Sequence, residues 1–271
     1  MSATASSPVA TRIWTRFTPA QRLARFAFYL LATAAIVWSL RKIEIIPEFL
    51  YDAPQQTWDL FQRMWPMDWA YYPKGVHDAL IETFHIATLG TLLSLLLGFP
   101  VALLAARNIT RSATLNWLAQ FILVSSRSVN SLIWALLFVA IFGPGAIAGV
   151  LAIGFRSIGF VGKLLAEALE EARAGPIEAL KATGAPASAV LAKGYWPQVE
   201  PSFWSVALFR WDINIRESAI LGLVGAGGIG VALDSALNNL YWDQVGLILL
   251  VIFAIVIAAE FVTSYIRGKI I

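Results

Sequence analysis

The sequence of 271 residues contains no cysteine, only two histidines and few charged residues. Without cysteine the chain forms no disulfide and has no thiolate chemistry, and two histidines are too few for a histidine-rich metal site. Charged residues make up 14% of the chain, against about 25% in a typical soluble domain. Hydrophobic residues make up 58%, and a soluble fold of this length does not hide so much apolar surface. Soluble enzymes and disordered chains are therefore excluded.

The net charge is only +3, and the basic residues stand in short clusters between apolar runs. This distribution argues against binding to a nucleic-acid backbone. The same distribution is typical of a chain that crosses a lipid bilayer several times. The sequence predicts an all-α, polytopic membrane protein with about six transmembrane helices.

Six apolar runs are long enough to be spans, which need roughly 20 mostly apolar residues. The run FAFYLLATAAIVWSL at residues 26–40 has basic residues on both sides. No small-residue cleavage site follows it, so an uncleaved span over 22–42 is favoured over a signal peptide. The polar residues 1–21 form a tail. The other predicted spans are 79–106 with a kink at Pro100, 115–142, 146–165, 201–224 and 245–265.

Residues 43–78 form the longest segment between predicted spans on the outer side. They contain scattered prolines and acids together with many tryptophans and tyrosines, which favour the membrane interface. We expect part of this segment to be a helix lying on the membrane surface. The remaining residues, 79–271, form the core transmembrane domain, in which Gly143, Pro144 and Gly145 make a tight turn.

The basic residues also predict the orientation of the chain. With an even number of spans, most basic clusters fall on one side, and the two later loops on the other side carry no basic residue. The positive-inside rule then places both termini and a polar loop at residues 166–198 in the cytoplasm.

That cytoplasmic loop includes EALKATGAPASAVLAKGYWPQVEP at residues 178–201. The first residues favour a helix, Gly184 can end it with a positive φ, and Pro186 favours the start of a second short helix. An exposed helix pair of this kind suits docking into a groove of a soluble partner. An ordinary amphipathic loop is the alternative.

The loop resembles the coupling motif of permeases of ABC importers, which runs Glu-Ala-Ala, three residues, Gly, nine residues and a hydrophobic-x-hydrophobic-Pro ending. Gly194 and Trp196 stand where the motif usually has Ile and Leu. The resemblance implies that the loop binds an ATPase subunit and transmits its motion. The residues that carry this implication are Glu178, Ala179, Leu180, Gly184, Ala185 and Pro197.

A narrower resemblance, to permeases that import phosphonates, covers about residues 125–235. The motifs that carry it include Arg216-Glu217-Ser218, GLVGAGGIG at 222–230, GAIAGVL at 145–151 and Pro197-Gln198-Val199. It implies a type I importer fold, a multi-pass location in the bacterial inner membrane and a substrate such as phosphonate, phosphite or hypophosphite. It also implies three partners: a second copy of the chain, a homodimeric ATPase and a periplasmic substrate-binding protein.

The chain has no G-x-x-x-x-G-K-[ST] motif, so we expect ATP and Mg²⁺ to bind to the ATPase subunit and this chain to hold no cofactor. We find no HExxH motif, no GxSxG motif and no cluster of carboxylates on a span, which disfavours a membrane-embedded enzyme. A secondary transporter driven by an ion gradient and an ABC permease for a different small solute stay open as alternatives.

Four arginines fall inside predicted spans: Arg127, Arg156, Arg210 and Arg216. An arginine in the hydrocarbon costs from about 3 to over 10 kcal/mol, so each must face protein or water. Arg216 is expected to pair with Asp212 one turn away, and Arg156 and Arg210 either snorkel or attract an oxyanion. The residues proposed to line a translocation path are Arg127, Ser128, Asn130, Arg210 and Arg216.

Gly225, Gly227, Gly228 and Gly230 satisfy the G-x-G-x-x-G pattern. That pattern binds dinucleotides only between a strand and a helix, whereas here it lies between two apolar spans. We interpret it as a site of close backbone packing where the chain turns back into the membrane. A weaker hypothesis is that its backbone amides line the path of an oxyanion.

Overall fold

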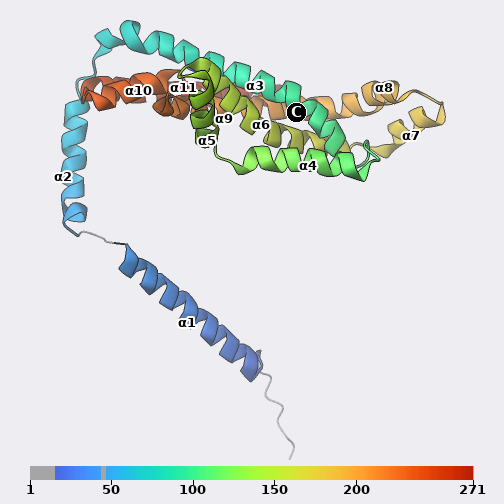
Figure 1. Cartoon of the computed structure of the whole chain (residues 1–271), viewed down its shortest axis with the longest axis horizontal. Coiled ribbons are helices and arrows are strands. Elements are labelled where there is room, and N and C mark those ends of the chain that lie inside the picture. The colour runs from blue at the N-terminus through green and yellow to red at the C-terminus, as the bar shows by residue number, and fades with distance from the viewer. Residues whose placement is uncertain (1–15, 44–46, 271) are drawn as a thin grey trace, which may run out of the picture. The chain divides into compact units, whose positions relative to one another are not determined.

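The computed structural model describes residues 16–43 and 47–270, and every regular element among them is a helix (Figure 1). The chain divides into two units, residues 1–58 and 59–271. The prediction of an all-α protein is therefore confirmed for this part of the chain. Of the predicted tail at 1–21, residues 1–15 lie outside the described residues.

Helix α1 (Pro19–Lys42) forms most of the described part of the first unit. Thr18 caps it through a reciprocal pair of bonds with Gln21, and Arg41 and Lys42 occupy its last turn. Acceptors at the start and cations at the end of a helix satisfy its free backbone groups and its dipole. None of its residues is buried, so its apolar side chains remain available to lipid.

Four of the described helices are long and apolar enough to cross a membrane, and six spans result if each of two bent helix pairs is one span. The four are α1, α3 (His77–Ala105), α6 (Ala146–Glu170) and α11 (Trp242–Ile270). The pairs are α4 (Ala113–Ser128) with α5 (Ser131–Phe142), and α9 (Trp196–Leu221) with α10 (Ile229–Asn238). This agrees with the predicted number of about six.

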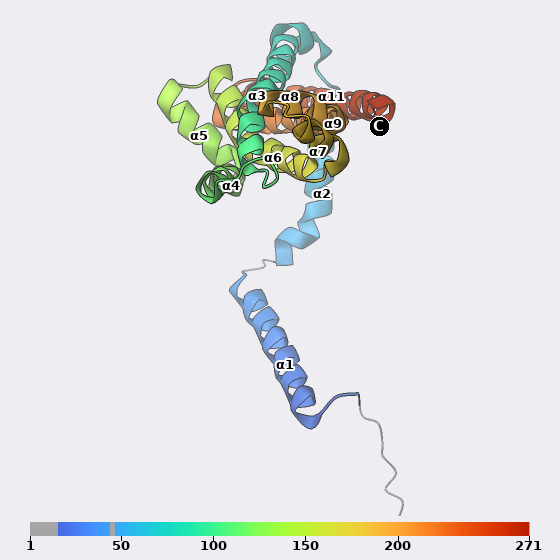
Figure 2. The same ribbon diagram turned by 90° about the vertical axis from the view of Figure 1, so that its right-hand side faces the viewer.

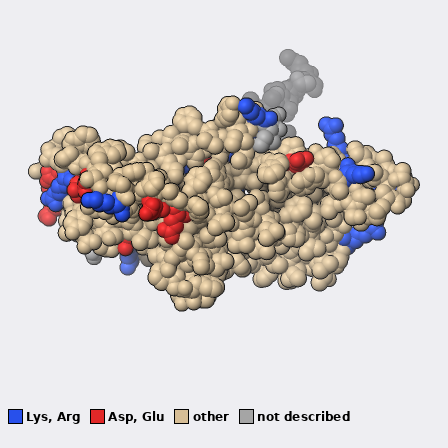
Figure 3. All heavy atoms as spheres, turned by 90° about the horizontal axis from the view of Figure 1, so that it is seen from above, with Lys and Arg blue, Asp and Glu red and all other residues tan. Residues whose placement is uncertain are grey.

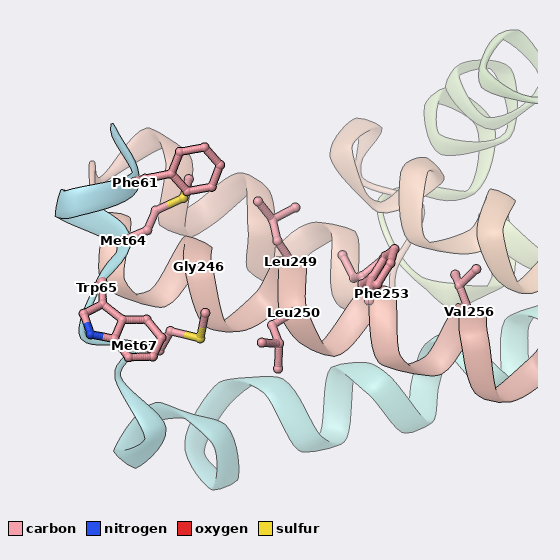
Figure 4. A pocket seen from close by; sticks show the side chains of 10 residues that line it. Phe61, Met64, Trp65, Met67, Gly246, Leu249, Leu250, Phe253 and Val256 are labelled. Carbon is pink, nitrogen blue, oxygen red and sulfur yellow. The ribbon is translucent and has the colours of Figure 1, made fainter. Parts of the chain in front are cut away.

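The predicted outer segment contains α2 (Pro47–Met64) and the short helices η1 (Trp69–Tyr71) and η2 (Tyr72–Val76). The end of α2 packs on the first half of α11, where Gly246 leaves room for the backbone of Met64. Beside this contact lies an apolar groove of about 870 Å³ whose lining includes Phe61, Trp65 and Phe253 (Figure 4). Residues 61–67 are thus packed on α11 through apolar contacts.

Helices α3 and α6 make the most extensive contact in the core. Small residues allow this close approach: a Cβ on Gly90 would lie 2.7 Å from Ile153, and one on Gly154 would lie 2.7 Å from Leu93. On the face drawn in Figure 3, most of the surface is uncharged. The pair forms the framework on which α4, α5 and α9 pack.

The span predicted over 115–142 is not a single helix but is broken. The helix stops at Ser128 and α5 starts at Ser131, at 90° to α4. Asn130 causes the restart, because its side-chain oxygen accepts a hydrogen bond from the N–H of Leu132 at 3.1 Å, as an N-cap residue does. The apolar run conceals a cap that a hydropathy average does not detect.

Other bounds also differ from the prediction. Helix α6 continues to Glu170 and α9 begins at Trp196, so the polar loop is shorter than 166–198. Residues 229–238, which lie between two predicted spans, form α10. Helix α3 continues through Pro100 and ends at Ala105. The turn at Gly143–Gly145 is confirmed, since both glycines have positive φ, 86° and 142°.

Replacing Gly159 with alanine is expected to destabilise the core. The new Cβ would lie 3.0 Å from the backbone N of Arg127 and would meet the carbonyl oxygen of Leu123 on α4. Overpacking of this kind costs about 1–3 kcal/mol. The destabilisation is measured as a lower thermal unfolding midpoint of the purified protein in detergent.

Gly175→Ala is the matched control, because a Cβ on that helical glycine meets nothing within 4 Å. It should leave the midpoint unchanged or raise it slightly. Equal midpoints for the two variants would contradict the close α4–α6 packing.

Candidate functional site

The polar loop folds as a helix, a glycine turn and a second helix. Helix α7 spans Ala174–Ala182 and α8 spans Ala187–Val190, followed by η3 (Leu191–Tyr195). Gly184 has φ +74°, and the N–H of Ala185 donates to the carbonyl of Leu180 at 3.2 Å, which closes the end of α7 as a C-cap motif does. The predicted local structure is confirmed.

Apolar side chains hold this loop on the helices that flank it. Ile177, Val190 and Tyr195 are buried in one cluster with Leu165 and Leu169 of α6. Figures 1 and 2 show α7 and α8 at the end of the core where α3 ends and α4 begins. Because the loop shares its core with α6, it does not hang free from the spans.

Gly194 explains one departure from the coupling motif. A Cβ at this position would lie 3.3 Å from Leu180 and 3.4 Å from Ile177. Leu180 therefore fills the space that a larger residue at 194 would need. Leu180, which takes the place of the second Ala of the motif, and Gly194 thus compensate for each other in the packing.

Gln198 joins the beginning of the loop to its end. Its side-chain oxygen accepts from the N–H of Arg173 at 2.9 Å, and its amide group donates to the carbonyls of Arg173 and Gly194 at 3.4 and 2.7 Å. Since Gln198 lies in the first turn of α9, these bonds tie the start of α7 to α9. Sequence reasoning noted Gln198 only as part of a motif and missed this role.

The other predicted loop residues lie mostly at the surface. Glu178, Ala179, Gly184 and Pro197 are exposed, whereas Leu180 and Ala185 are half-buried. A Cβ on Gly184 would meet nothing within 4 Å. The turn therefore presents small side chains and bare backbone to the surroundings, while the buried side of the loop faces α6 and α9.

A first ion network lies between α6 and α9. The carboxylate of Glu217 pairs with Arg156 and, at 3.3 Å, with Arg210. Arg210 is only 3% exposed, and its Nε donates to Ser157 at 2.8 Å. Arg156 and Arg210 are therefore both paired with a carboxylate of the protein.

Neutral side chains extend this network to α3. The hydroxyl of Ser157 donates to Asn214 at 3.2 Å, and the amide of Asn214 donates to Thr91 at 2.8 Å. Asn214 and Ser157 are fully buried. A chain of hydrogen bonds therefore links the charged groups to the α3–α6 framework, as buried polar groups require.

A second network connects α9 with α11. Arg216 donates to Asp212 at 2.6 Å and also pairs with Glu260. The predicted pairing of Arg216 with Asp212 is confirmed. The sequence analysis did not predict the pairing with Glu260, because residues 44 positions apart on separate helices leave no local pattern.

The polar cluster around Arg127 has structural functions as well. Ser126 donates to the carbonyl of Phe155 and accepts from the N–H of Gly159 at 3.2 Å. Ser128 donates to the carbonyl of Val124 at 2.6 Å. Arg127 is exposed and has no ion pair with any described residue. Of the five residues proposed to line a path, Arg210 and Arg216 are engaged in separate networks.

The glycine motif forms a reversal between α9 and α10. Gly225, Gly227 and Gly228 all have positive φ, and a Cβ on Gly230 would lie 2.7 Å from the Cα of Gly222. The N–H of Gly145 donates to the carbonyl of Gly225 at 2.9 Å. No strand precedes the motif in the described chain, so the dinucleotide interpretation does not apply. The backbones of Gly222 and Gly230 and those of Gly145 and Gly225 approach one another closely, as we expect for a site of backbone packing.

Comparison with known proteins identifies similar sequences. Residues 98–268 match the family described as "Binding-protein-dependent transport system inner membrane component". The chain is 35% identical over 250 residues to the phosphate-import permease protein PhnE of Mycolicibacterium smegmatis. The aligned region covers 92% of this chain and 47% of that relative. The chain thus spans about half the length of this relative. It is 40% identical over 202 residues to the phosphite transport system permease protein PtxC of Stutzerimonas stutzeri. That aligned region covers 74% of this chain and 73% of PtxC.

Solved structures show the same fold. The MetNI methionine ABC transporter in an inward-facing conformation matches with a TM-score of 0.65 at 21% identity, over 76% of this chain and 100% of that chain. An amino acid ABC transporter matches with a TM-score of 0.61 at 19% identity, over 74% of this chain and 96% of that chain. At this identity the likeness concerns the fold alone, and it agrees with the expected importer permease fold.

Replacing Gln198 with leucine is expected to loosen the loop without unfolding the core, because three hydrogen bonds to Arg173 and Gly194 are lost. Amide hydrogen exchange of residues 173–195 should become faster. Gln198→Glu keeps the acceptor for the N–H of Arg173 and should give an intermediate rate. Unchanged exchange in the leucine variant would contradict the tie between α7 and α9.

Proposed function

The chain belongs to the family of binding-protein-dependent transport system inner membrane components, as its motifs predicted, and we propose that it is the membrane-spanning permease of an ATP-driven importer of phosphorus oxyanions. The relatives that are 35% and 40% identical are named for phosphate and phosphite transport. This naming supports a phosphonate-like, phosphite-like or phosphate-like substrate for this chain.

The observation that carries the proposal is the attachment of the exposed loop to two spans. Residues 174–195 share a buried cluster with α6 and are tied to α9 through Gln198. A partner that moves α7 and α8 therefore moves the ends of both spans. Small exposed residues around Gly184 leave an open surface on which an ATPase subunit can dock.

In this mechanism ATP binding and hydrolysis take place on a separate ATPase, and this chain carries no catalytic residue. Closure of two ATPase subunits shifts the loops of two permease copies and changes the access of the central path from one side to the other. A periplasmic binding protein delivers the substrate. Both termini and the loop lie in the cytoplasm, in accordance with the distribution of basic residues.

The exposed arginine at the end of α4 supports a path between two copies of the chain. Arg127 is exposed and lies at the 90° break between α4 and α5. An exposed cation in a membrane span needs water or protein around it. A hydrated path lined by Arg127, Ser128 and Asn130 would satisfy this need.

Uptake into proteoliposomes tests the function. The chain is reconstituted with its ATPase and binding-protein partners, and phosphite, methylphosphonate, aminoethylphosphonate, phosphate and methionine are offered in parallel. ATP-dependent uptake of a phosphorus oxyanion is the expected result. Uptake of methionine alone would assign the chain to a different solute, and uptake with a catalytically dead ATPase would indicate a secondary transporter.

Gly184→Asp tests the role of the loop. The change places a carboxylate on the open turn and forces a positive φ on a residue with a Cβ, which costs about 1–2 kcal/mol. We expect uptake and substrate-stimulated ATP hydrolysis to fall by about tenfold or more, the equivalent of about 1.4 kcal/mol of docking free energy, while insertion into the membrane is unchanged.

Gly184→Ala and Gly268→Asp are the controls for this substitution. The alanine variant has the same backbone strain without the charge, so it separates the two effects. Gly268 also has open space around its Cα and lies at the end of α11, on the same predicted side of the membrane. Normal transport by Gly184→Asp, or equal losses in Gly184→Asp and Gly268→Asp, would rule out docking at this turn.

A further inference from the structure

A small cavity opens on the ion network between α6 and α9. It has a volume of about 200 Å³, and its polar lining consists of the side chains of Arg156, Arg210 and Glu217. The rest of the lining is apolar and includes Phe160 and Ile213. Two guanidinium groups and one carboxylate therefore face a space that is otherwise lined by hydrocarbon and aromatic rings.

The charges at this cavity do not balance. Two guanidinium groups share the single carboxylate of Glu217, which leaves one positive charge in excess. Both guanidinium groups lie over the ring of Phe160, at 5.5 and 5.0 Å from its centroid. The Nε of Arg156 is buried and has no hydrogen-bond partner in the described part of the chain. An excess charge and an unpaired donor at such depth are costly, and an anion would relieve both.

We propose that this cavity is a transient binding site for the substrate oxyanion, in which Glu217 acts as an internal competitor. The inference rests on the proposed function, because it takes the phosphorus oxyanion as the substrate. Guanidinium groups donate pairs of hydrogen bonds to phosphate-like oxygens. Glu217 occupies the same donors when the substrate is absent.

The competition with Glu217 explains how a strongly cationic site can release its ligand. Conduction requires that a site bind strongly enough for entry and weakly enough for exit. A carboxylate that returns to Arg156 and Arg210 offsets part of the affinity of the oxyanion. Since Arg156 lies on α6 while Arg210 and Glu217 lie on α9, a shift of α9 relative to α6 would change this balance.

The apolar walls also determine which oxyanion fits. Three oxygens of a phosphonate or phosphite can face the two guanidinium groups, and the remaining C–P or H–P bond then faces Phe160, Phe209 or Ile213 without loss. Phosphate has an oxygen at that position. An oxygen against an apolar wall loses its hydrogen bonds to water and gains none. The site therefore favours an oxyanion that carries one apolar substituent over phosphate.

The test uses the complex of the permease and its ATPase in lipid nanodiscs, without the binding protein. Methylphosphonate, phosphite and phosphate are added separately, and the affinity is obtained from the dependence of the thermal midpoint on anion concentration. ATP-driven uptake by the whole transporter is measured in parallel. The variants are Arg156→Gln, Arg156→Lys and Glu217→Gln.

Lys163→Gln is the matched control. Lys163 lies on the same helix as Arg156 and pairs with Glu167 at 3.0 Å, and it is not among the residues that line the cavity. The substitution removes the same charge from the same helix. It should leave anion binding unchanged.

We expect methylphosphonate and phosphite to bind the wild type about tenfold more tightly than phosphate, and Arg156→Gln to weaken their binding by about tenfold. Arg156→Gln leaves the pair of Arg210 and Glu217 intact, so the variant keeps a neutral network. Arg156→Lys keeps the charge without the planar fork and should bind with intermediate affinity. Glu217→Gln should bind these anions more tightly and transport them more slowly.

Arg156→Gln should weaken anion binding and Glu217→Gln should strengthen it, and these opposite effects distinguish a binding site from a merely structural network. A structural network predicts that Glu217→Gln lowers the midpoint and gains no anion-dependent stabilisation, and that result overturns the proposal. Equal binding by wild type, Arg156→Gln and Lys163→Gln overturns it as well. If ATP-driven uptake of a phosphorus oxyanion persists in that case, the proposed function stands and only this site is rejected.

Discussion

The carboxylate of Glu217, shared by Arg156 and Arg210, is the interaction on which the arrangement of α6 and α9 depends. An arginine within a membrane has no water to solvate it and must find its partners in the protein. Glu217 supplies a countercharge to one guanidinium on each helix. Ser157 and Asn214 then connect the group to Thr91 of α3. Helices α3, α6 and α9 are thus joined by a single polar network.

The same two helices carry the exposed loop at one end. Helix α6 leads into α7, and η3 leads into α9, while Gln198 ties both sides of the loop together. A displacement applied to the loop therefore acts on the relative position of α6 and α9, which is what the pairing of Arg156 with Glu217 depends on. At the glycines of α3 and α6, side chains of the facing helix such as Ile153 and Leu93 fill the space, and this close packing resists deformation. Motion of α9 against a fixed α3–α6 pair is the mechanically simplest response.

Local signals in the sequence were enough to predict the features that arise from local physics. The spans follow from hydropathy, the turn of the loop follows from Gly184 and Pro186, and the pair of Asp212 with Arg216 follows from their spacing of one helical turn. The break between α4 and α5 was also encoded locally, by Asn130, but the apolar residues on both sides masked it. The partners of Glu217 and of Gln198 could not be predicted, because Arg156 and Arg173 are brought to them only by the packing of separate helices. The resemblance to a permease family identified which loop mattered but not what holds it in place.

The glycine motif shows why packing decides the meaning of a short pattern. G-x-G-x-x-G serves phosphate binding when its free N–H groups point at a ligand from the start of a helix. Here the N–H groups of Gly225 and Ala226 already donate to the carbonyls of Gly222 and Leu221, at 2.9 and 3.2 Å, and the N–H of Ile229 donates to Thr83 at 2.7 Å. Backbone donors that are satisfied within the protein are poorly suited to hold an anion. These three bonds serve the reversal between α9 and α10, whereas the side chains of Arg156 and Arg210 offer an anion donors whose own countercharge is incomplete.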